Sequence, residues 1–358
     1  MTKRKFAMEQ DQMACNNGRT WKREHLLGKG GFGSVYLAKL KRPESKSQIY
    51  PPVMAVKSAE LSESSSLQQE KEVFNNIYGC PFIVQCYGEE TTFNRHCQRF
   101  YNILLEYASG GTLANLIERS DARGLPESDV RRYTRCILEG IRYIHSRGYV
   151  HCDLKPENVL LVSTENGDFV PKIADFGLAK KVVKKRKVAD STAGGTTMYM
   201  APETVVDNVQ DFPCDIWALG CIVFEMFTGS PLWYDSDTTS DELIKSIGDR
   251  HQLPEIPYDI PEDGRAFLKK CLVKNPMFRL TADMLLNEPF VSGLRDDKCS
   301  DIAENSVEGQ RRSCDSSRSK DLDFISKEDY TASSVPYGRL LRVVRTQGRQ
   351  FKQPARVC

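Results

Sequence analysis

The chain has 358 residues, of which 40% are hydrophobic and 27% charged, a composition that allows a sizeable buried core. Its formal net charge of +2 excludes an electrostatic affinity of the whole chain for nucleic acid or for a membrane surface. The longest apolar stretch, residues 216–227, is shorter than the roughly 20 residues of a membrane span. No apolar signal sequence and no Cys-x-x-Cys pair occur, so we expect a reducing compartment, the cytoplasm with or without the nucleus.

The first part of the chain has the pattern of a β-sheet with one helix. Residues 1–20 are polar and are expected to form a flexible leader. From Trp21 to about Glu60, short apolar runs separated by glycines and by a polar loop predict strands. Residues 62–78 have helical spacing, and two further strands are expected at residues 82–87 and 100–107.

The chain becomes mainly helical after Ser109-Gly110-Gly111. Between Val130 and His145 the apolar residues recur on one face, which predicts a buried amphipathic helix. Beyond Phe290 the composition shifts to Ser, Asp, Lys and Arg, which predicts a disordered tail over residues 291–358. Further helices are expected at residues 215–227, 241–247, 264–273 and 281–286.

A glycine-rich segment follows the first strand. Gly28-Lys29-Gly30-Gly31-Phe32-Gly33-Ser34-Val35 fits the pattern Gly-x-Gly-x-x-Gly-x-Val, in which backbone amides approach phosphate oxygens with no Cβ in the way. A hairpin turn would also favour glycine, so both interpretations stay open. The strand-like residues 34–39 argue against a dinucleotide-binding fold, which requires a helix at this point.

Ala55-Val56-Lys57 ends an apolar strand with a lysine. An ordinary edge lysine is the simpler interpretation of this feature alone. In a phosphoryl-transfer enzyme, Lys57 would bind the α- and β-phosphates of a nucleotide and would be held by a glutamate of the following helix. Glu70 and Glu72 are both available, and Glu70 is preferred because it suits the apolar face of that helix better.

The segment His151-Cys152-Asp153-Leu154-Lys155-Pro156-Glu157-Asn158 concentrates the polar groups that phosphoryl transfer requires. Asp153 can accept the proton of a substrate hydroxyl, Lys155 can neutralise charge on the transferred group, and Asn158 can ligate Mg²⁺. Asp175-Phe176-Gly177 follows 17 residues after Asn158, and Asp175 would hold the main Mg²⁺. A polar surface loop would not explain this combination.

Taken together, these motifs resemble the eukaryotic protein kinases over residues 21–290. Ala201-Pro202-Glu203 and Asp215-Ile216-Trp217-Ala218-Leu219-Gly220 match two further motifs of that family. By the same resemblance, Glu203 is expected to pair with Arg279.

The resemblance implies an α+β, bilobal protein kinase fold, with a β-rich N-lobe (21–108) and a mainly helical C-lobe (109–290). It also implies ATP and Mg²⁺ as cofactors. Leu105 takes the gatekeeper position, and the backbone of Glu106 and Ala108 would contact the adenine edge. The full set expected to contact ATP is Leu27, Gly28, Gly30, Gly33, Val35, Ala55, Lys57, Leu105, Glu106, Ala108 and Leu160.

Two features imply specificity for serine and threonine rather than tyrosine. Lys155 stands two residues after Asp153, and Gly195-Thr196 precedes Met198-Tyr199-Met200. In the family, the threonine at the position of Thr196 bridges the catalytic Asp and Lys.

Cys152 departs from the family, in which an arginine usually stands at this position and receives an activation-loop phosphate. Thr192 is the candidate phosphosite, but a cysteine cannot form a charge-assisted pair with its phosphate. Control of this non-RD kinase is therefore expected to lie outside the usual loop-phosphate switch.

Within the kinases, the closer resemblance is to plant MAP kinase kinase kinases of the short MEKK-like group. It is carried by residues 104–113 (LLEYASGGTL), 151–161 (HCDLKPENVLL), 172–180 (KIADFGLAK) and 195–203 (GTTMYMAPE), with Trp21 before the glycine loop. The resemblance implies that the substrates are MAP kinase kinases, in stress or hormone signalling.

Alternative functions stay open. A pseudokinase scaffold would have the same fold without catalysis, and a Ser/Thr kinase outside the MAP kinase cascade would share the catalytic residues. The basic segments at residues 180–187 and 339–345 could dock an acidic substrate, direct nuclear import or bind a regulator of the tail. A solvated loop and a disordered tail are the simpler interpretations.

Overall fold

The computed structural model describes residues 17–31, 33–41, 50–120, 123–182, 194–233, 239–249 and 254–293. Most of the expected leader and tail therefore lies outside the described residues, as do Thr192 and residues 183–187 of the basic segment. All the other residues expected in the active site lie within them.

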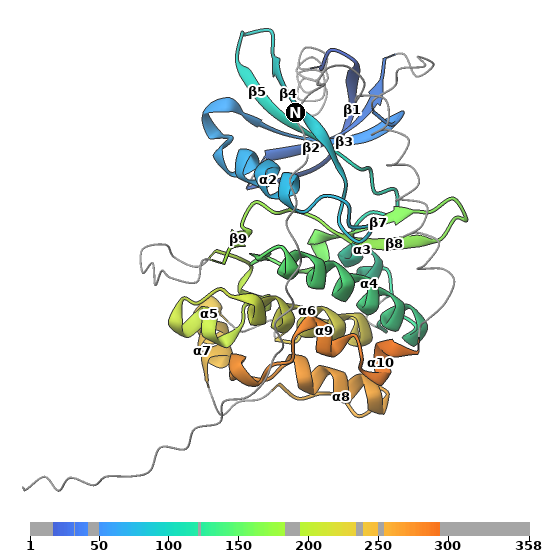
Figure 1. Ribbon diagram of the computed structural model, residues 1–358, viewed down its shortest axis with the longest axis vertical. Helices are drawn as coiled ribbons and strands as arrows, with labels where there is room; N and C mark the ends of the chain where they lie inside the picture. Colours follow the sequence, from blue (N-terminus) through green and yellow to red (C-terminus); the bar gives the residue numbers. More distant parts are fainter. Residues whose placement is uncertain are drawn as a thin grey trace, which may run out of the picture. The chain divides into compact units, whose positions relative to one another are not determined.

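A five-stranded antiparallel sheet forms the N-terminal lobe, with the strand order β1-β2-β3-β5-β4 (Figure 1). Helix α2 (Ser65–Asn76) packs against it and is shorter than the expected helix, because residues 61–63 form a separate 3₁₀ turn. The strands are β1 (Trp21–Gly30), β2 (Gly33–Leu40), β3 (Val53–Glu60), β4 (Cys86–Phe93) and β5 (Arg99–Leu105).

Alternation along β3 sends its side chains to two separate cores. Met54 and Val56 join a small cluster on one face of the sheet, and Ala55 joins the main core with the apolar residues of α2. Since successive side chains of a strand point to opposite faces, Lys57 lies on the face of Ala55, toward α2. The pattern of the strand thus directs the lysine at the helix that carries Glu70.

Helix α6 (Phe212–Thr228) forms the centre of the C-terminal lobe. Every residue from Cys214 to Met226 is buried, and a helix that is buried all round must be enclosed by its neighbours. It begins where the Asp211 side chain accepts a hydrogen bond from Phe212 N at 2.7 Å, and it ends at Gly229 with a φ of 73°.

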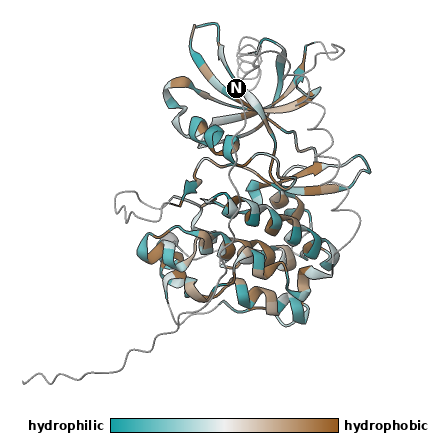
Figure 2. Cartoon of the chain, in the orientation of Figure 1, coloured by the Kyte–Doolittle hydropathy of each residue, from teal (hydrophilic) through white to brown (hydrophobic). Residues whose placement is uncertain are grey.

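The helices around α6 carry alternating hydrophilic and hydrophobic segments along their length (Figure 2), as amphipathic helices do. The longest is α4 (Glu127–Ser146), which has a buried face of apolar residues as expected. The other elements are α3 (Leu113–Glu118), β6 (Tyr149–Val150), β7 (Val159–Ser163), β8 (Phe169–Ile173), β9 (Lys180–Lys181), α5 (Pro202–Asp207), α7 (Ser240–Gly248), α8 (Glu262–Cys271), α9 (Ala282–Leu285) and α10 (Pro289–Ser292), with 3₁₀ turns η2 (Pro156–Asn158), η3 (Thr197–Tyr199) and η4 (Pro276–Phe278).

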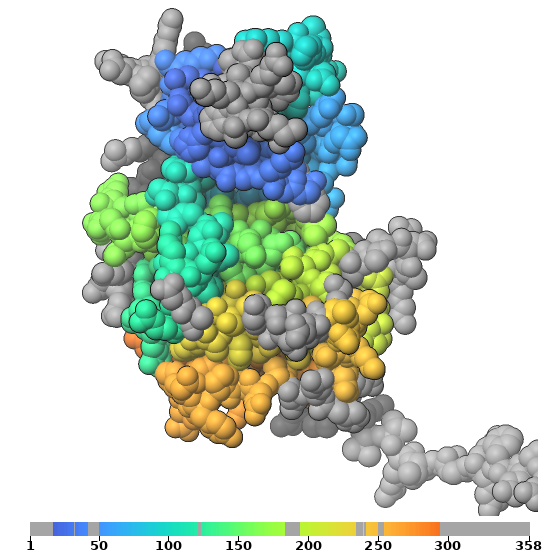
Figure 3. All heavy atoms as spheres, turned by 180° about the vertical axis from the view of Figure 1, so that it is seen from behind, coloured from blue at the N-terminus to red at the C-terminus, as the bar shows by residue number. Residues whose placement is uncertain are grey.

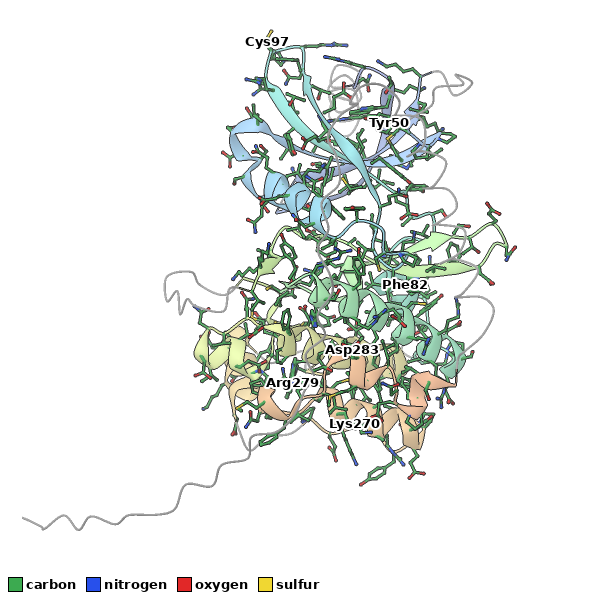
Figure 4. The ribbon with its side chains drawn as sticks, viewed as in Figure 1. Tyr50, Phe82, Cys97, Lys270, Arg279 and Asp283 are labelled. Atoms are coloured by element: carbon green, nitrogen blue, oxygen red, sulfur yellow. The ribbon has the colours of Figure 1, made fainter. Side chains whose placement is uncertain are left out.

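The strand expected at residues 82–87 is wrong for most of that segment, because β4 begins at Cys86. Val84 N donates to Ile173 O, and Ile173 N donates to Phe82 O, both at 2.9 Å. Residues 82–84 are therefore hydrogen-bonded to the end of β8 instead of to β5. Phe82 lies between the sheet and the helical lobe (Figure 4). Apolar composition alone does not specify which of two strands becomes the partner.

The expected α+β, bilobal arrangement is confirmed, with the strand-rich lobe on one side of the helical lobe (Figures 1 and 3). The expected pair of Glu203 and Arg279 is also present, with N–O distances of 2.6 and 3.0 Å. None of the described helices is long and apolar enough to cross a membrane.

Candidate active site

Lys57 joins three elements at the boundary between the lobes. Its Nζ lies 2.7 Å from Glu70 Oε2 on α2 and 3.0 Å from Asp175 Oδ1, just after β8. Lys57 is 6% exposed and Glu70 1% exposed, so this is a buried ion pair. Glu72, the other glutamate considered for this contact, is exposed on the same helix.

Charge favours the ionised forms of Lys57 and Asp175 despite their burial, whereas burial raises the pKa of Glu70 against the opposing charge of Lys57. Burial alone would lower the pKa of Lys57, but the nearby charges of Glu70 and Asp175 raise it above its usual value. For Asp175, burial acts to raise the pKa, and Lys57 more than offsets this and holds it below its usual value. Lys57 is therefore a fixed positive charge and Asp175 a fixed negative one.

Asp153 is held by two residues of the catalytic segment (residues 151–158), Lys155 and Asn158, and by Thr196. Its Oδ1 accepts hydrogen bonds from Thr196 N at 2.9 Å and Thr196 Oγ1 at 3.0 Å. Lys155 Nζ lies 3.1 Å from Asp153 Oδ2 and donates to Thr196 Oγ1 at 2.6 Å. Asn158 Nδ2 donates to the Asp153 backbone oxygen at 2.8 Å and to Oδ2 at 3.2 Å. Thr196 thus bridges Asp153 and Lys155.

The backbone before Asp153 is anchored to the central helix. Asp215 on α6 accepts hydrogen bonds from His151 N at 2.9 Å and Cys152 N at 3.1 Å. Cys152 has a φ of 69° and Asp175 a φ of 63°, a left-handed conformation that is uncommon outside glycine. Such strain persists only where surrounding contacts fix the backbone, and both positions have them.

An aromatic stack connects α2 to the catalytic segment. The ring of Phe176 lies 5.1 Å from that of Phe74 on α2 and 4.9 Å from that of His151. His151 Nε2 in turn lies 3.0 Å from the backbone oxygen of Ala174. The positions of Glu70, Asp175 and Asp153 are therefore coupled by packing as well as by charge.

The fold requires a glycine at only some positions of the glycine-rich segment between β1 and β2. Gly33 has a φ of 124°, and a Cβ there would lie 2.4 Å from Ser58 O, so the hairpin itself requires this glycine. A Cβ at Gly28 or Gly30 would meet no atom within 4 Å. Packing does not explain these two glycines, whereas close approach of a phosphate to the backbone does.

The residues expected around adenine come from both lobes. Ala55 on β3 pairs with Leu105 on β5, and both are buried. Val35 on β2 and Leu160 on β7 are partly buried and pack on the main core. Leu27 is 41% exposed on β1. These are apolar side chains of the kind that lines nucleotide pockets.

Glu106 has a role that its sequence position does not reveal. Its carboxylate accepts hydrogen bonds from Lys172 Nζ at 2.7 and 2.9 Å and from Gln85 N at 3.1 Å. The segment after β5 is therefore fastened to β8. Farther along it, the Ala108 oxygen accepts from Gly111 N at 3.3 Å.

Gln210 was also missed, because it belongs to no motif. Its side-chain oxygen accepts from Lys180 Nζ at 2.5 Å, and its nitrogen donates to Gly194 O at 2.8 Å. Lys180 and Gly194 lie on either side of residues 183–193, which the structure does not describe. One neutral side chain thus links the two flanks of that segment.

Asp175 and Asn158 form a donor set that fits Mg²⁺. The Asn158 amide nitrogen faces Asp153, which leaves its amide oxygen for a cation. No group of three or more His, Cys, Asp or Glu side chains suited to a metal occurs in the described part of the chain. Mg²⁺ does not require one, because it is typically bound by one or two protein groups together with phosphates and water.

Comparison with known proteins gives the same assignment. Residues 21–291 match the protein kinase domain family. The chain therefore belongs to this family, and ATP is its phosphoryl donor.

Its relatives narrow the assignment to a serine/threonine kinase close to the plant MAP kinase kinase kinases. The chain is 43% identical to mitogen-activated protein kinase kinase kinase 20 of Arabidopsis thaliana, over 77% of this chain and 80% of that protein. It is 38% identical to mitogen-activated protein kinase kinase kinase 17 of the same plant, over 76% of this chain and 69% of that protein. It is 36% identical to kinase kinase kinase 18, over 80% of this chain and 81% of that protein.

Glu225 is a buried carboxyl group in the last turns of α6. It accepts a hydrogen bond from Tyr199 Oη at 2.7 Å, and its exposure is 8%. Burial raises its pKa to about 7, with a further increase from the charge of Glu157 and an opposing effect of Tyr199. Between pH 4.5 and 7 the folded protein thus retains a proton that the unfolded chain releases. The stability that this proton provides is complete below pH 4.5 and is lost as the pH rises through 7.

We predict that Glu225→Gln, which keeps an acceptor for Tyr199 but has no charge, raises the free energy of unfolding by roughly 1–3 kcal/mol at pH 8. The gain shrinks as the pH falls toward 5. Urea titrations at several pH values measure this. Glu118→Gln, at an exposed position of α3, serves as the control with no such gain. A gain of equal size at pH 5 and pH 8 would contradict the prediction.

Proposed function

We propose that this kinase phosphorylates MAP kinase kinases on serine and threonine residues of their activation loops, in stress or hormone signalling. The proposal is supported by the names of its relatives, which are MAP kinase kinase kinases. The match to numbers 20 and 18 covers 80% and 81% of those proteins. The observation that carries the chemistry is the contact of Asp153 with Thr196 and Lys155, since this places an acceptor for a hydroxyl proton beside a positive charge.

Each residue has one role in the proposed transfer. Lys57 binds the α- and β-phosphates of ATP, and Glu70 holds it in place. Asp153 orients the substrate hydroxyl and accepts its proton, while Lys155 neutralises charge on the transferred γ-phosphoryl group. Thr196 fixes the geometry of these two side chains.

Asp175 and Asn158 would hold Mg²⁺, which when bound neutralises phosphate charge. The ion pair with Lys57 at 3.0 Å keeps Asp175 ionised and oriented toward the phosphates. We place the adenine ring between Val35, Ala55 and Leu160, with its edge at the backbone of Glu106 and Ala108. Gly28 and Gly30 leave the space above the phosphates open.

A panel of MAP kinase kinases, each inactivated at its own catalytic lysine, tests the proposal. We expect phosphate on activation-loop serine or threonine in at least one of them, mapped by mass spectrometry. Asp153→Asn should lower incorporation by about 10²-fold or more, because the proton acceptor is lost. Phosphorylation of a generic protein but of no MAP kinase kinase would refute the cascade assignment, and equal incorporation by Asp153→Asn would refute the role of Asp153.

We also propose that a loop phosphate has little influence on activity. Cys152 carries no positive charge to receive one, and Gln210 already joins the two flanks of the loop through Lys180 and Gly194. Control would then come from elsewhere, and the basic residues 339–345, outside the described part of the chain, are our candidate for binding a regulator.

Thr192→Ala is therefore expected to retain activity within about 10-fold of the unmodified kinase, because Thr192 phosphate has no arginine at position 152 to bind. Thr196→Ala is the matched comparison and should lose more than about 10-fold, because its hydroxyl bridges Asp153 and Lys155. Initial rates with a generic protein substrate measure both. A loss above about 10-fold in Thr192→Ala would contradict this account.

A further inference from the structure

Two cysteines lie beside the catalytic aspartate. Cys152 precedes Asp153 in the chain, and Cys214 is in the first turn of α6. The Cys152 Sγ also lies 3.6 Å from the Val150 backbone oxygen. Both cysteines are free and line one small cavity, together with Asp153 and Thr196.

The backbone around the pair is fixed on two sides. Asp215, the neighbour of Cys214, accepts a hydrogen bond from Cys152 N at 3.1 Å. On the other side, Gly195 lies so close that a Cβ there would be 2.8 Å from the Cys152 oxygen. The two cysteines are therefore held at one cavity by the same interactions that position residues 151–158.

The two cysteines differ in accessibility. Cys152 is partly exposed, whereas Cys214 is only 6% exposed. Cys152 is thus the thiol that a small reagent reaches first. Cys214 is its buried neighbour at the cavity, and it must release its proton as its sulfur reacts.

We propose that Cys152 and Cys214 form a modification site at which a hydroperoxide produces an intrachain disulfide that reversibly inhibits the kinase. In the first step Cys152 sulfur attacks one oxygen of hydrogen peroxide, the O–O bond breaks, and sulfenic acid and one water form. In the second step Cys214 sulfur attacks that sulfenic sulfur, the S–O bond breaks, and the hydroxyl leaves with the Cys214 proton as water. The two thiols lose two electrons in total, and the peroxide gains them.

Inhibition follows from the position of Cys152. Disulfide formation brings the sulfurs to about 2.05 Å, closer than two thiols in contact, and pulls the Cys152 backbone toward α6. Asp153 is the next residue, and its carboxylate depends on hydrogen bonds of 2.9 and 3.0 Å to Thr196. A displacement of about 1 Å at such a site is enough to lower the rate by about 10²-fold.

The experiment treats the full chain with hydrogen peroxide, then measures intact mass, non-reducing peptide maps and activity on a generic protein. We expect a mass decrease of about 2 Da, a peptide linking Cys152 to Cys214, and an activity loss of at least about 10-fold that dithiothreitol reverses. The mass readout does not depend on catalysis, so its failure is distinguishable from failure of the proposed function.

Cys214→Ala should keep basal activity within about twofold and lose both the linked peptide and the reversible inhibition. Cys221→Ala, a buried cysteine of the same helix, and Cys97→Ser, an exposed cysteine at the end of the β4–β5 hairpin (Figure 4), should behave as the unmodified chain. As a test that needs no variant, phenylarsine oxide, which bridges neighbouring thiols, should be found on the Cys152 and Cys214 peptides.

Three results would overturn the proposal. The first is peroxide treatment that yields no peptide linking the two cysteines, together with no arsenical on them. The second is an equal and reversible loss of activity in Cys214→Ala. The third is a complete disulfide with unchanged activity, which would remove the inhibitory role.

Discussion

The ion pair of Lys57 with Glu70 and Asp175 is the constraint on which the rest of this molecule depends. Its members come from β3, from α2 and from the segment after β8, so it forms only when the sheet, the helix and the C-terminal lobe are all in place. Buried charges are unfavourable unless each one is compensated. The same contacts that compensate the charges of the cluster thus fix the positions of Lys57 and Asp175.

Two further sets of contacts connect the ion pair to Asp153, namely an aromatic stack and the hydrogen bonds of Asp215. The rings of Phe74, Phe176 and His151 form a continuous stack from α2 to the catalytic segment. Asp215 holds the backbone of that segment from α6, the most enclosed helix. Cys152 lies between these two supports, which is why we propose that its oxidation displaces Asp153.

Local sequence predicted the residues whose roles depend on spacing along the chain. A lysine at the end of an apolar strand predicted a glutamate partner on the following helix, and helical periodicity favoured Glu70 over Glu72. The contacts of Gln210 and of Glu106 with Lys172 could not be predicted, because no spacing along the chain joins the partners and both contacts arise only from the tertiary fold. For the same reason most of the apolar run at residues 82–87 was wrongly predicted as a strand.

The most direct test of the central claim compares Glu70→Gln with Glu72→Gln, two charge removals on one helix, of which only the first affects the ion pair. Glu70→Gln removes the charge that holds Lys57 in place, so kcat/KM should fall by about 10²-fold or more. Glu72→Gln should stay within about twofold, and thermal melts should show that both variants fold. Equal activity of the two folded variants would contradict the account.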